Sequence, residues 1–221
     1  MTTINSWIPL HDLPADKVTP PCYHYEQLKR DDINELLSGI SDWYPDIEVG
    51  SGRRYLDHSF YAEQTYLAGE TVKDRITYVG KFEGKIIAAM CLELHHDSSV
   101  IYSRFGVCAP QHRRTGASLF AAYAIDAQAK GLGLAMAYCY VTLKSPAMQL
   151  MLEKAGFRPV GILPCSDREM VAPQDVKYVT EVLYCKTYAH SSEIATVAPE
   201  QMSEQVRRLW DYLQAGQRGS V

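Results

Sequence analysis

A short basic segment in the middle of the chain has residue types that suit phosphate binding. The segment CAPQHRRTGASLF (108–120) follows an apolar run and precedes an alanine-rich run, so we expect it to join a strand to a helix. The first N–H groups of a helix have no partner inside it and carry partial positive charge. Gly116 allows close approach of the backbone to an anion, and the residues after it are small. One interpretation is therefore a backbone cradle for a phosphate, with Arg113 and Arg114 as added positive charge.

Other interpretations of the segment differ in how well they fit. A surface turn with two solvated arginines needs no ligand, and from the segment alone it stays open. A nucleic-acid patch is disfavoured, because one basic cluster in an acidic chain is a small footprint. The P-loop pattern GxxxxGK[ST] is absent, and GLGLAM (131–136) lacks the third glycine of a dinucleotide-binding turn and precedes a strand.

Composition limits the class of protein. The chain has 221 residues, 47% of them apolar and 22% charged, which predicts one globular domain with an appended element. Its net charge of −4 offers no general attraction to nucleic acid or anionic membrane. None of the 6 cysteines forms a CxxC pair, so we expect no metal site. The N-terminus lacks a basic, apolar leader and no stretch is long enough to span a membrane, so we expect a cytoplasmic protein with reduced thiols.

The hydrophobic pattern predicts a mixed α/β fold. Apolar runs at 75–84 and 85–96 are separated by Glu83-Gly84, which indicates an antiparallel hairpin, and a third strand follows at 100–109. A helix at 118–130 then leads to an apolar strand at 134–143, so these last two strands are expected to be parallel neighbours. Further elements are expected as a strand at 22–28, helices at 29–43, 55–69, 145–157 and 199–216, and strands at 158–164 and 176–189, with loops at 50–54 and 164–177.

The segment and its context resemble the GNAT superfamily of N-acetyltransferases. RRTGAS fits that family's pyrophosphate loop, with Arg113 first, Gly116 at its glycine and Ser118 at its last small position. SPAMQLMLEKAGFRPVG (145–161) looks like the family's later motif, in which a helix ends in E-K-x-G-F before a strand. The order of elements over residues 22–188 is also that of the family. The resemblance implies a mixed sheet of six to seven strands, flanked by helices and splayed open between the strands 100–109 and 134–143.

The resemblance also implies a cofactor and its contacts. Acetyl-CoA would be the co-substrate, and no metal is implied. Its pyrophosphate would bind the backbone of the loop, and its pantetheine amides would pair with an exposed strand edge. The residues implied in cofactor binding are Phe105, Gly106, Val107, Arg113, Arg114, Thr115, Gly116, Ala117, Ser118 and Ser145.

The catalytic groups are harder to transfer from the family. Many members carry a tyrosine two residues before the motif lysine as general acid, but here that position is Leu152. Tyr140 and Ser145 are candidate replacements, and Glu93 is the candidate base that makes the amine neutral. His95, His96 and Tyr102 remain alternative bases, and a covalent route through Cys139 remains a weaker alternative to direct transfer in a ternary complex.

The remaining segments are expected to shape the acceptor site and the ends of the chain. Aromatic side chains of the first strand and helices, together with the loop 164–177, would line a pocket for a small-molecule amine; these aromatic residues are Tyr23, Tyr25, Trp43, Tyr44, Tyr55 and Tyr61. The alternative is that the tyrosines only pack against strands and helix faces. Residues 1–21 are expected as an extended arm, 22–188 as the acetyltransferase domain, and 189–221 as a spacer with an amphipathic packing or homodimer helix. The predicted function is acetyl transfer from acetyl-CoA to an amine. The alternatives are a non-catalytic acyl-CoA sensor and an enzyme that uses a longer acyl-CoA or an acyl-carrier protein.

Overall fold

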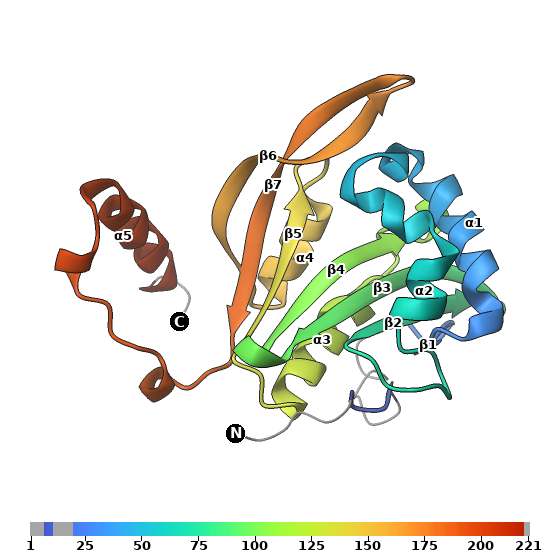
Figure 1. Ribbon diagram of the computed structural model, residues 1–221, viewed down its shortest axis with the longest axis horizontal. Coiled ribbons are helices and arrows are strands. Elements are labelled where there is room, and N and C mark those ends of the chain that lie inside the picture. Colours follow the sequence, from blue (N-terminus) through green and yellow to red (C-terminus); the bar gives the residue numbers. More distant parts are fainter. Residues whose placement is uncertain (1–6, 11–19, 219–221) are drawn as a thin grey trace. The chain divides into compact units, whose positions relative to one another are not determined.

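The first unit of the protein is built on a seven-stranded mixed sheet in the order β1-β2-β3-β4-β5-β7-β6 (Figure 1). The computed structural model describes residues 7–10 and 20–218, and side chains up to residue 215. The strands are β1 (Tyr23–Gln27), β2 (Arg75–Phe82), β3 (Lys85–His95), β4 (Val100–Cys108), β5 (Met136–Thr142), β6 (Arg158–Ala172) and β7 (Asp175–Thr187). The helices are α1 (Ile33–Trp43), α2 (His58–Gln64), α3 (Leu119–Gly131), α4 (Ala147–Lys154) and α5 (Glu204–Arg218). Contacts divide the chain into two compact units, Met1–Tyr188 and Ala189–Val221.

Helices cover both faces of the sheet, and the strand sequences explain why. In β3, Met90 and Leu92 pack in a core with α3 and α4, whereas Ala89 and Cys91 pack in a second core with α1 and α2. Alternate residues of a strand face opposite sides, so a strand covered on both faces is apolar throughout. Figure 1 shows α1 and α2 over the β1–β4 half of the sheet and α3 behind it.

One strand pair is parallel. All neighbouring strands run antiparallel except β4 and β5, which are joined by α3. The prediction of parallel neighbours at 100–109 and 134–143 is therefore confirmed. Their pairing covers only Val100–Ser103 of β4 and Met136–Cys139 of β5, so the strands separate before either one ends.

Several predicted boundaries were wrong. The segment 164–177 is not a loop, because β6 and β7 continue through it as a long hairpin that turns at 173–174. The segment 50–54 belongs to a 3₁₀ helix, η5 (Gly50–Leu56), and α2 spans only His58–Gln64, because Tyr66 is extended and pairs with β2. Polar residues in a strand and a short helical turn both look like loop in sequence, since neither buries a periodic apolar face.

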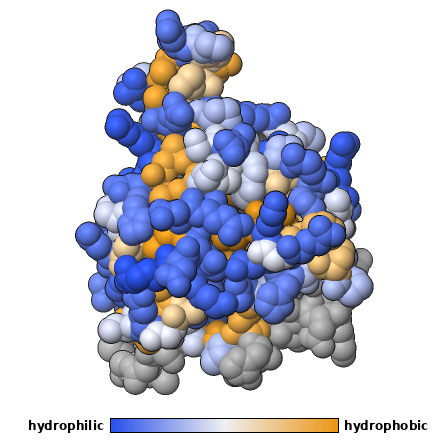
Figure 2. Space-filling view, turned by 90° about the vertical axis from the view of Figure 1, so that its right-hand side faces the viewer, coloured by the Kyte–Doolittle hydropathy of each residue, from blue (hydrophilic) through white to orange (hydrophobic). Residues whose placement is uncertain are grey.

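The structure describes part of each end of the chain. Most of the predicted N-terminal arm lies outside the described residues, but Trp7 is buried in the core and its indole N–H donates to the carbonyl of Lys73 at 2.9 Å. The C-terminal helix begins at Glu204, five residues later than predicted. No helix among the described residues is long and apolar enough to cross a membrane. The face of the molecule in Figure 2 is mostly hydrophilic, with hydrophobic patches between.

Candidate active site

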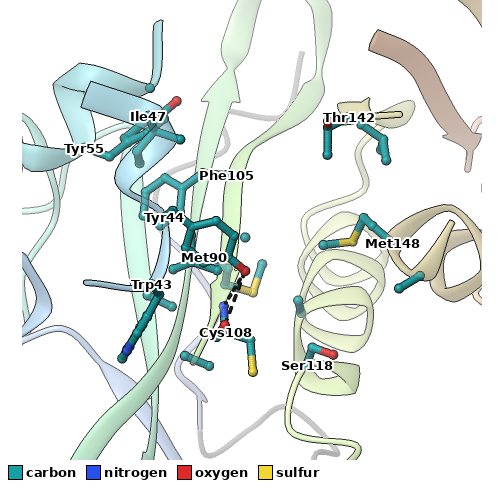
Figure 3. Close-up of a pocket in the computed structure, with 18 of the residues that line it drawn as sticks. Trp43, Tyr44, Ile47, Tyr55, Met90, Phe105, Cys108, Ser118, Thr142 and Met148 are labelled. Carbon is teal, nitrogen blue, oxygen red and sulfur yellow. Dashed lines mark hydrogen bonds between the residues drawn. The ribbon is translucent and has the colours of Figure 1, made fainter. Parts of the chain in front are cut away.

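The site lies where β4 and β5 separate. Beyond Ser103 and Cys139 the two strands no longer pair, and a cavity of about 570 Å³ is lined by residues from both strands. Figure 3 shows the two walls, with Tyr44, Tyr55 and Phe105 on one and Thr142 and Met148 on the other. A wedge between two strands exposes backbone groups that a continuous sheet would pair, so it can bind an extended ligand as an added strand.

The loop before α3 forms one end of this cavity. Arg114 has φ 64° and Gly116 has φ 93°, and this left-handed backbone bends the chain sharply. The N–H groups of Arg114, Thr115, Gly116 and Ser118 donate to no protein acceptor among residues 7–10 and 20–218. They lie at the N-terminus of a helix of 13 residues, where the helix dipole adds positive potential. Such a loop can hold a phosphate through its backbone.

Strand β1 holds the loop in place from behind. The Tyr25 hydroxyl donates to the carbonyl of Ala117 at 2.8 Å, and the Tyr23 hydroxyl donates to Thr115 Oγ1 at 2.9 Å. Tyr23 was expected in the acceptor pocket, but it does not line the cavity, and Tyr25 lines it at the loop. The register of β1 with β2 carries both side chains to the loop, which no local pattern indicates.

Arg113 also positions the loop rather than pointing freely into solvent. Its guanidinium donates to the carbonyl of Cys108 at 3.1 Å and to that of Trp43 at 3.3 Å, and it stacks 4.8 Å from the centre of the Tyr44 ring. The arginine therefore ties the loop to the end of α1. Arg114 lines the cavity with no ion pair to a carboxylate among the described residues, so it is the better placed of the two for direct contact with an anion.

The exposed edge of β4 offers backbone groups at Gly106. The Ala109 N–H donates to the carbonyl of Ile87 in β3, and in an antiparallel pair every second residue directs its backbone N–H and carbonyl groups to the partner strand. The backbone groups of Val107 therefore also point toward β3, whereas those of Gly106 and Cys108 point toward the gap. The Cys108 N–H is already bound, since it donates to the Tyr44 hydroxyl at 3.2 Å (Figure 3). Of the expected edge residues Phe105, Gly106 and Val107, all three line the cavity, and Gly106 has backbone groups directed into it.

The bulge in β4 falls at Arg104, and this removes Glu93 from the candidate bases. Cys91 pairs with Phe105 and Leu92 pairs with Ser103, so Arg104 is the extra residue. Its guanidinium binds the Glu93 carboxylate, which also binds Arg75 at 2.6 Å. Burial alone would raise the pKa of Glu93, but the hydrogen bonds and charges of the two arginines outweigh it and lower that pKa. Glu93 does not line the cavity, so its carboxylate serves the ion-pair network and not the wedge.

The other two expected catalytic residues, Tyr140 and Ser145, both line the cavity. Tyr140 lies one residue beyond the last β4–β5 pair, and its side chain is 39% exposed in the cavity lining. Ser145 lines the cavity too, at the start of α4, where its hydroxyl accepts from Ala147 N–H at 3.2 Å. Pro146 and not Ser145 is the N-cap residue of α4, one position later than expected.

Leu152 and Cys139 are core residues. The Leu152 side chain is 2% exposed and packs with the α3–α4 core, so its position does not face the cavity. Cys139 is 6% exposed, and its burial raises the pKa of the thiol to about 12. A thiol that stays protonated at neutral pH is a poor nucleophile, so Cys139 is poorly suited to carry the acetyl group in a covalent route.

The β6–β7 hairpin closes the end of the cavity opposite the loop. Asp167 of β6 accepts hydrogen bonds from the Ser51 N–H at 2.8 Å and the Ser51 hydroxyl at 2.6 Å. The Lys144 ammonium binds Asp46 and, at 2.6 Å, Glu169 of β6. These contacts join the hairpin to the segment between α1 and α2, which η4 (Pro45–Glu48) and η5 form. We call this set of contacts the clasp.

Glu181, which was not predicted as a site residue, lines the same end of the cavity. Glu181 stands in the apolar run YVTEVLYC of β7, and a single carboxylate in such a run was the available signal. Among the described residues, no group of three or more His, Cys, Asp or Glu side chains is arranged to hold a metal ion.

Solved structures with the same arrangement identify the fold. An acetyltransferase of the GNAT family from Streptococcus pneumoniae superposes with a TM-score of 0.57 over 76% of this chain and 99% of its own, at 15% identity. The chain has the GNAT acetyltransferase fold. Spermidine N-acetyltransferase from Vibrio cholerae (TM-score 0.55, 15% identity, 76% of this chain, 95% of its own) is also similar. So is an IAA acetyltransferase from Bacillus cereus (TM-score 0.53, 16% identity, 75% of this chain, 99% of its own).

The comparisons by sequence found no relatives, since neither a family model nor a curated protein matches the chain. Structural similarity at identities near 15% shows that the chain shares the GNAT fold, but it does not show which acceptor the chain uses. The expected resemblance to the GNAT superfamily is confirmed at the level of the fold. The resemblance had implied that the cofactor binds at the loop 113–118 and in the gap between β4 and β5.

Proposed function

We propose that this protein transfers an acetyl group from acetyl-CoA to the amine of a small molecule by direct transfer in a ternary complex. The observation that carries the proposal is the cavity itself, which has free backbone donors at one end, an open strand edge along its side and carboxylates at the other end. The backbone donors suit a pyrophosphate, the strand edge suits the amides of a pantetheine arm, and the carboxylates suit an amine. The structural similarity to a spermidine N-acetyltransferase supports the same reaction class.

The cofactor fits the residues present. The N–H groups of Arg114, Thr115, Gly116 and Ser118 suit the pyrophosphate, and Arg114 adds a guanidinium beside them. The Gly106 backbone suits an amide of the pantetheine arm, since its N–H and carbonyl groups turn away from β3 toward the gap. An added strand between β4 and α4 would direct the thioester toward the point where the two strands separate.

Tyr140 is the hydroxyl best placed to assist the leaving thiolate. It lines the cavity one residue past the separation of β4 and β5, whereas Leu152 is buried away from it. A positioned acid contributes typically 10²–10⁴-fold to a rate, so loss of the family's tyrosine does not abolish transfer if Tyr140 takes its place. Replacement of Tyr140 by Phe is expected to lower kcat and leave acetyl-CoA affinity unchanged.

Calorimetry and thermal shift with acetyl-CoA, longer acyl-CoAs and CoA test the cofactor. The decisive variant is Ser118→Asp. Ser118 is the N-cap residue of α3 and its side chain makes no cap hydrogen bond, so Asp at this position is expected to preserve or raise stability. The same carboxylate would repel a pyrophosphate, so acetyl-CoA affinity is expected to fall about tenfold or more, which corresponds to about 1.4 kcal/mol.

Ser203→Asp is the matched control, because Ser203 precedes the first turn of α5 in the other unit. It is expected to leave acetyl-CoA affinity unchanged. Unaltered binding by Ser118→Asp would contradict the role of the loop, and failure of every CoA compound to bind would contradict the cofactor. A thiol-release assay across amines then separates an enzyme from the acyl-CoA sensor, which would bind without turnover.

A further inference from the structure

Glu181 differs from the other carboxylates that line the cavity. Asp46 and Glu169 share the ammonium of Lys144, and Asp167 accepts from Ser51. Within the described part of the chain, no cationic side chain lies within 4.0 Å of the Glu181 carboxylate. Glu181 therefore faces the cavity with no positive charge of its own to bind.

The sheet register places Glu181 close to the reacting end of the wedge. Glu181 of β7 pairs with Thr142 of β5, and Tyr140 lies two residues earlier on β5, on the same face. Diagonal neighbours of this kind are about 7–8 Å apart between backbones, within reach of long side chains. The carboxylate and the Tyr140 hydroxyl thus belong to the same end of the cavity.

The surroundings of Glu181 favour its neutral form. Burial raises the pKa of the carboxyl, the nearby Ser166 hydroxyl lowers it only in part, and the charges of Asp167 and Glu169 on β6 raise it further. From β4, Tyr102 lies near enough for its own pKa to respond to the Glu181 charge. A carboxylate that is desolvated and surrounded by like charge attracts a cation and accepts a proton more readily than an exposed one.

We propose that Glu181 binds the amino group of the acceptor and takes a proton from it, and that the acceptor is consequently a cationic amine with no carboxylate nearby. This inference rests on the acetyl transfer proposed above. Asp46, Asp167 and Glu169 lie at the same end of the cavity. Among the described residues, Lys144 pairs with two of them and no cation pairs with Asp167, so an acceptor carboxylate would meet uncompensated negative charge.

The step is balanced as follows. The ammonium of the acceptor gives one proton to Glu181, and the neutral nitrogen attacks the carbonyl carbon of the acetyl thioester. The new C–N bond forms and the C–S bond breaks, with its electron pair leaving on sulfur. The second nitrogen-bound proton passes to the thiolate by way of Tyr140 or water, and Glu181 releases its proton to solvent. The products are the N-acetyl amide, the CoA thiol and one proton.

Three acceptors of equal chain length test the substrate class. In the thiol-release assay, 1,4-diaminobutane is expected to have at least a tenfold higher kcat/KM than 4-aminobutanoate, with 4-amino-1-butanol between them. Equal or better use of 4-aminobutanoate would overturn the inference while leaving acetyl transfer intact. Turnover of none of the three, with acetyl-CoA still bound, would also overturn it. Failure of acetyl-CoA to bind at all would instead contradict the proposed function.

Glu181→Gln tests the residue, and Asp175→Asn is its control. Asp175 lies on the same strand, has a 45% exposed side chain and does not line the cavity. Glu181→Gln is expected to lower kcat/KM for the diamine about 100-fold with unchanged acetyl-CoA affinity, whereas Asp175→Asn stays within about twofold of the wild type. The wild-type kcat/KM should fall as pH drops through the raised pKa of Glu181, and the variant should lose that limb.

A stability measurement provides a readout without any acceptor. A carboxyl whose pKa is raised by folding disfavours the folded state once it is ionised, so its contribution to stability is lost as pH rises through the folded pKa. Glu181→Gln should therefore raise the Tm at pH 7, and the gain should vanish near pH 4. A lower Tm at pH 7 would mean that the Glu181 carboxylate is held by a structural partner, and would overturn the assignment.

Discussion

Gly50 is the residue on which the clasp depends most directly. It has φ 69°, and a Cβ built on it would lie 2.1 Å from the carbonyl oxygen of Arg168 and 2.5 Å from Asp167 Oδ1. Gly50→Ala therefore cannot be accommodated by rotation of a side chain. The β6 backbone at Arg168 has to move by about 0.9 Å to restore a separation of 3.0 Å, and the adjacent hydrogen bonds between Ser51 and Asp167 move with it.

Gly69→Ala provides the matched control. Gly69 has φ 80°, and nothing lies within 4 Å of its added Cβ, so only the strain of the left-handed backbone destabilises this variant. That strain is about 1–2 kcal/mol for a non-glycine residue and applies to both variants. Loss of the two hydrogen bonds at Asp167 adds about 2 kcal/mol to Gly50→Ala alone, at about 1 kcal/mol each.

The two variants are compared by thermal unfolding and by hydrogen exchange. For a unit of this size, about 2 kcal/mol lowers the Tm by roughly 4–8 °C, so Gly50→Ala should melt that far below Gly69→Ala. The Ser51 amide, which is bound to Asp167, should exchange faster in Gly50→Ala only. If the proposed function holds, KM for the acceptor should rise while acetyl-CoA affinity stays. Equal Tm values and equal exchange at Ser51 would refute the clasp.

Three further variants test residues that support or surround the site. Tyr25→Phe removes the 2.8 Å hydrogen bond to the Ala117 carbonyl, so acetyl-CoA affinity should fall about fivefold in calorimetry for a bond of about 1 kcal/mol, and unchanged affinity would show that β1 does not hold the loop. Leu152→Tyr should lower stability by about 1–3 kcal/mol in denaturant unfolding without raising kcat, because the site is full, and a gain in kcat would show that this position faces the cavity. Glu93→Gln should lower the free energy of unfolding at pH 7 by about 2 kcal/mol. The pKa of Glu93 is lowered in the folded state, so its ionised carboxylate stabilises the fold above the unfolded-state pKa, and this stabilisation is lost as pH falls through the folded-state pKa. The loss should therefore shrink in unfolding curves at lower pH, and a pH-independent loss would contradict the ion-pair account.

Local sequence was sufficient for the elements that make their own contacts. The loop at 113–118 could be predicted because a glycine and small residues before an alanine-rich helix expose backbone donors, and this property depends on a few neighbouring residues. The β2–β3 hairpin was predicted for the same reason, since Glu83 and Gly84 take the positive φ values of a tight turn. The parallel pair β4–β5 followed from a helix of sufficient length between two apolar strands.

The tertiary structure decided which distant residues meet in the cavity. Glu93 was predicted as the base from its place in β3, but the bulge at Arg104 and the register with β2 give its carboxylate two arginine partners. Glu181 reaches the same cavity because β7 inserts between β5 and β6, an order of strands that no local pattern contains.

By itself, the sequence determined the fold class, the loop at 113–118 and the short-range turns. The loop and the turns depend on backbone groups that lie within a few residues of one another. Only the tertiary structure decided the end of the cavity opposite the loop, where Asp46, Lys144, Glu169 and Glu181 come from four separate segments. The physical reason is that a carboxylate's charge, pKa and role depend on which cations the sheet register brings within about 4 Å of it.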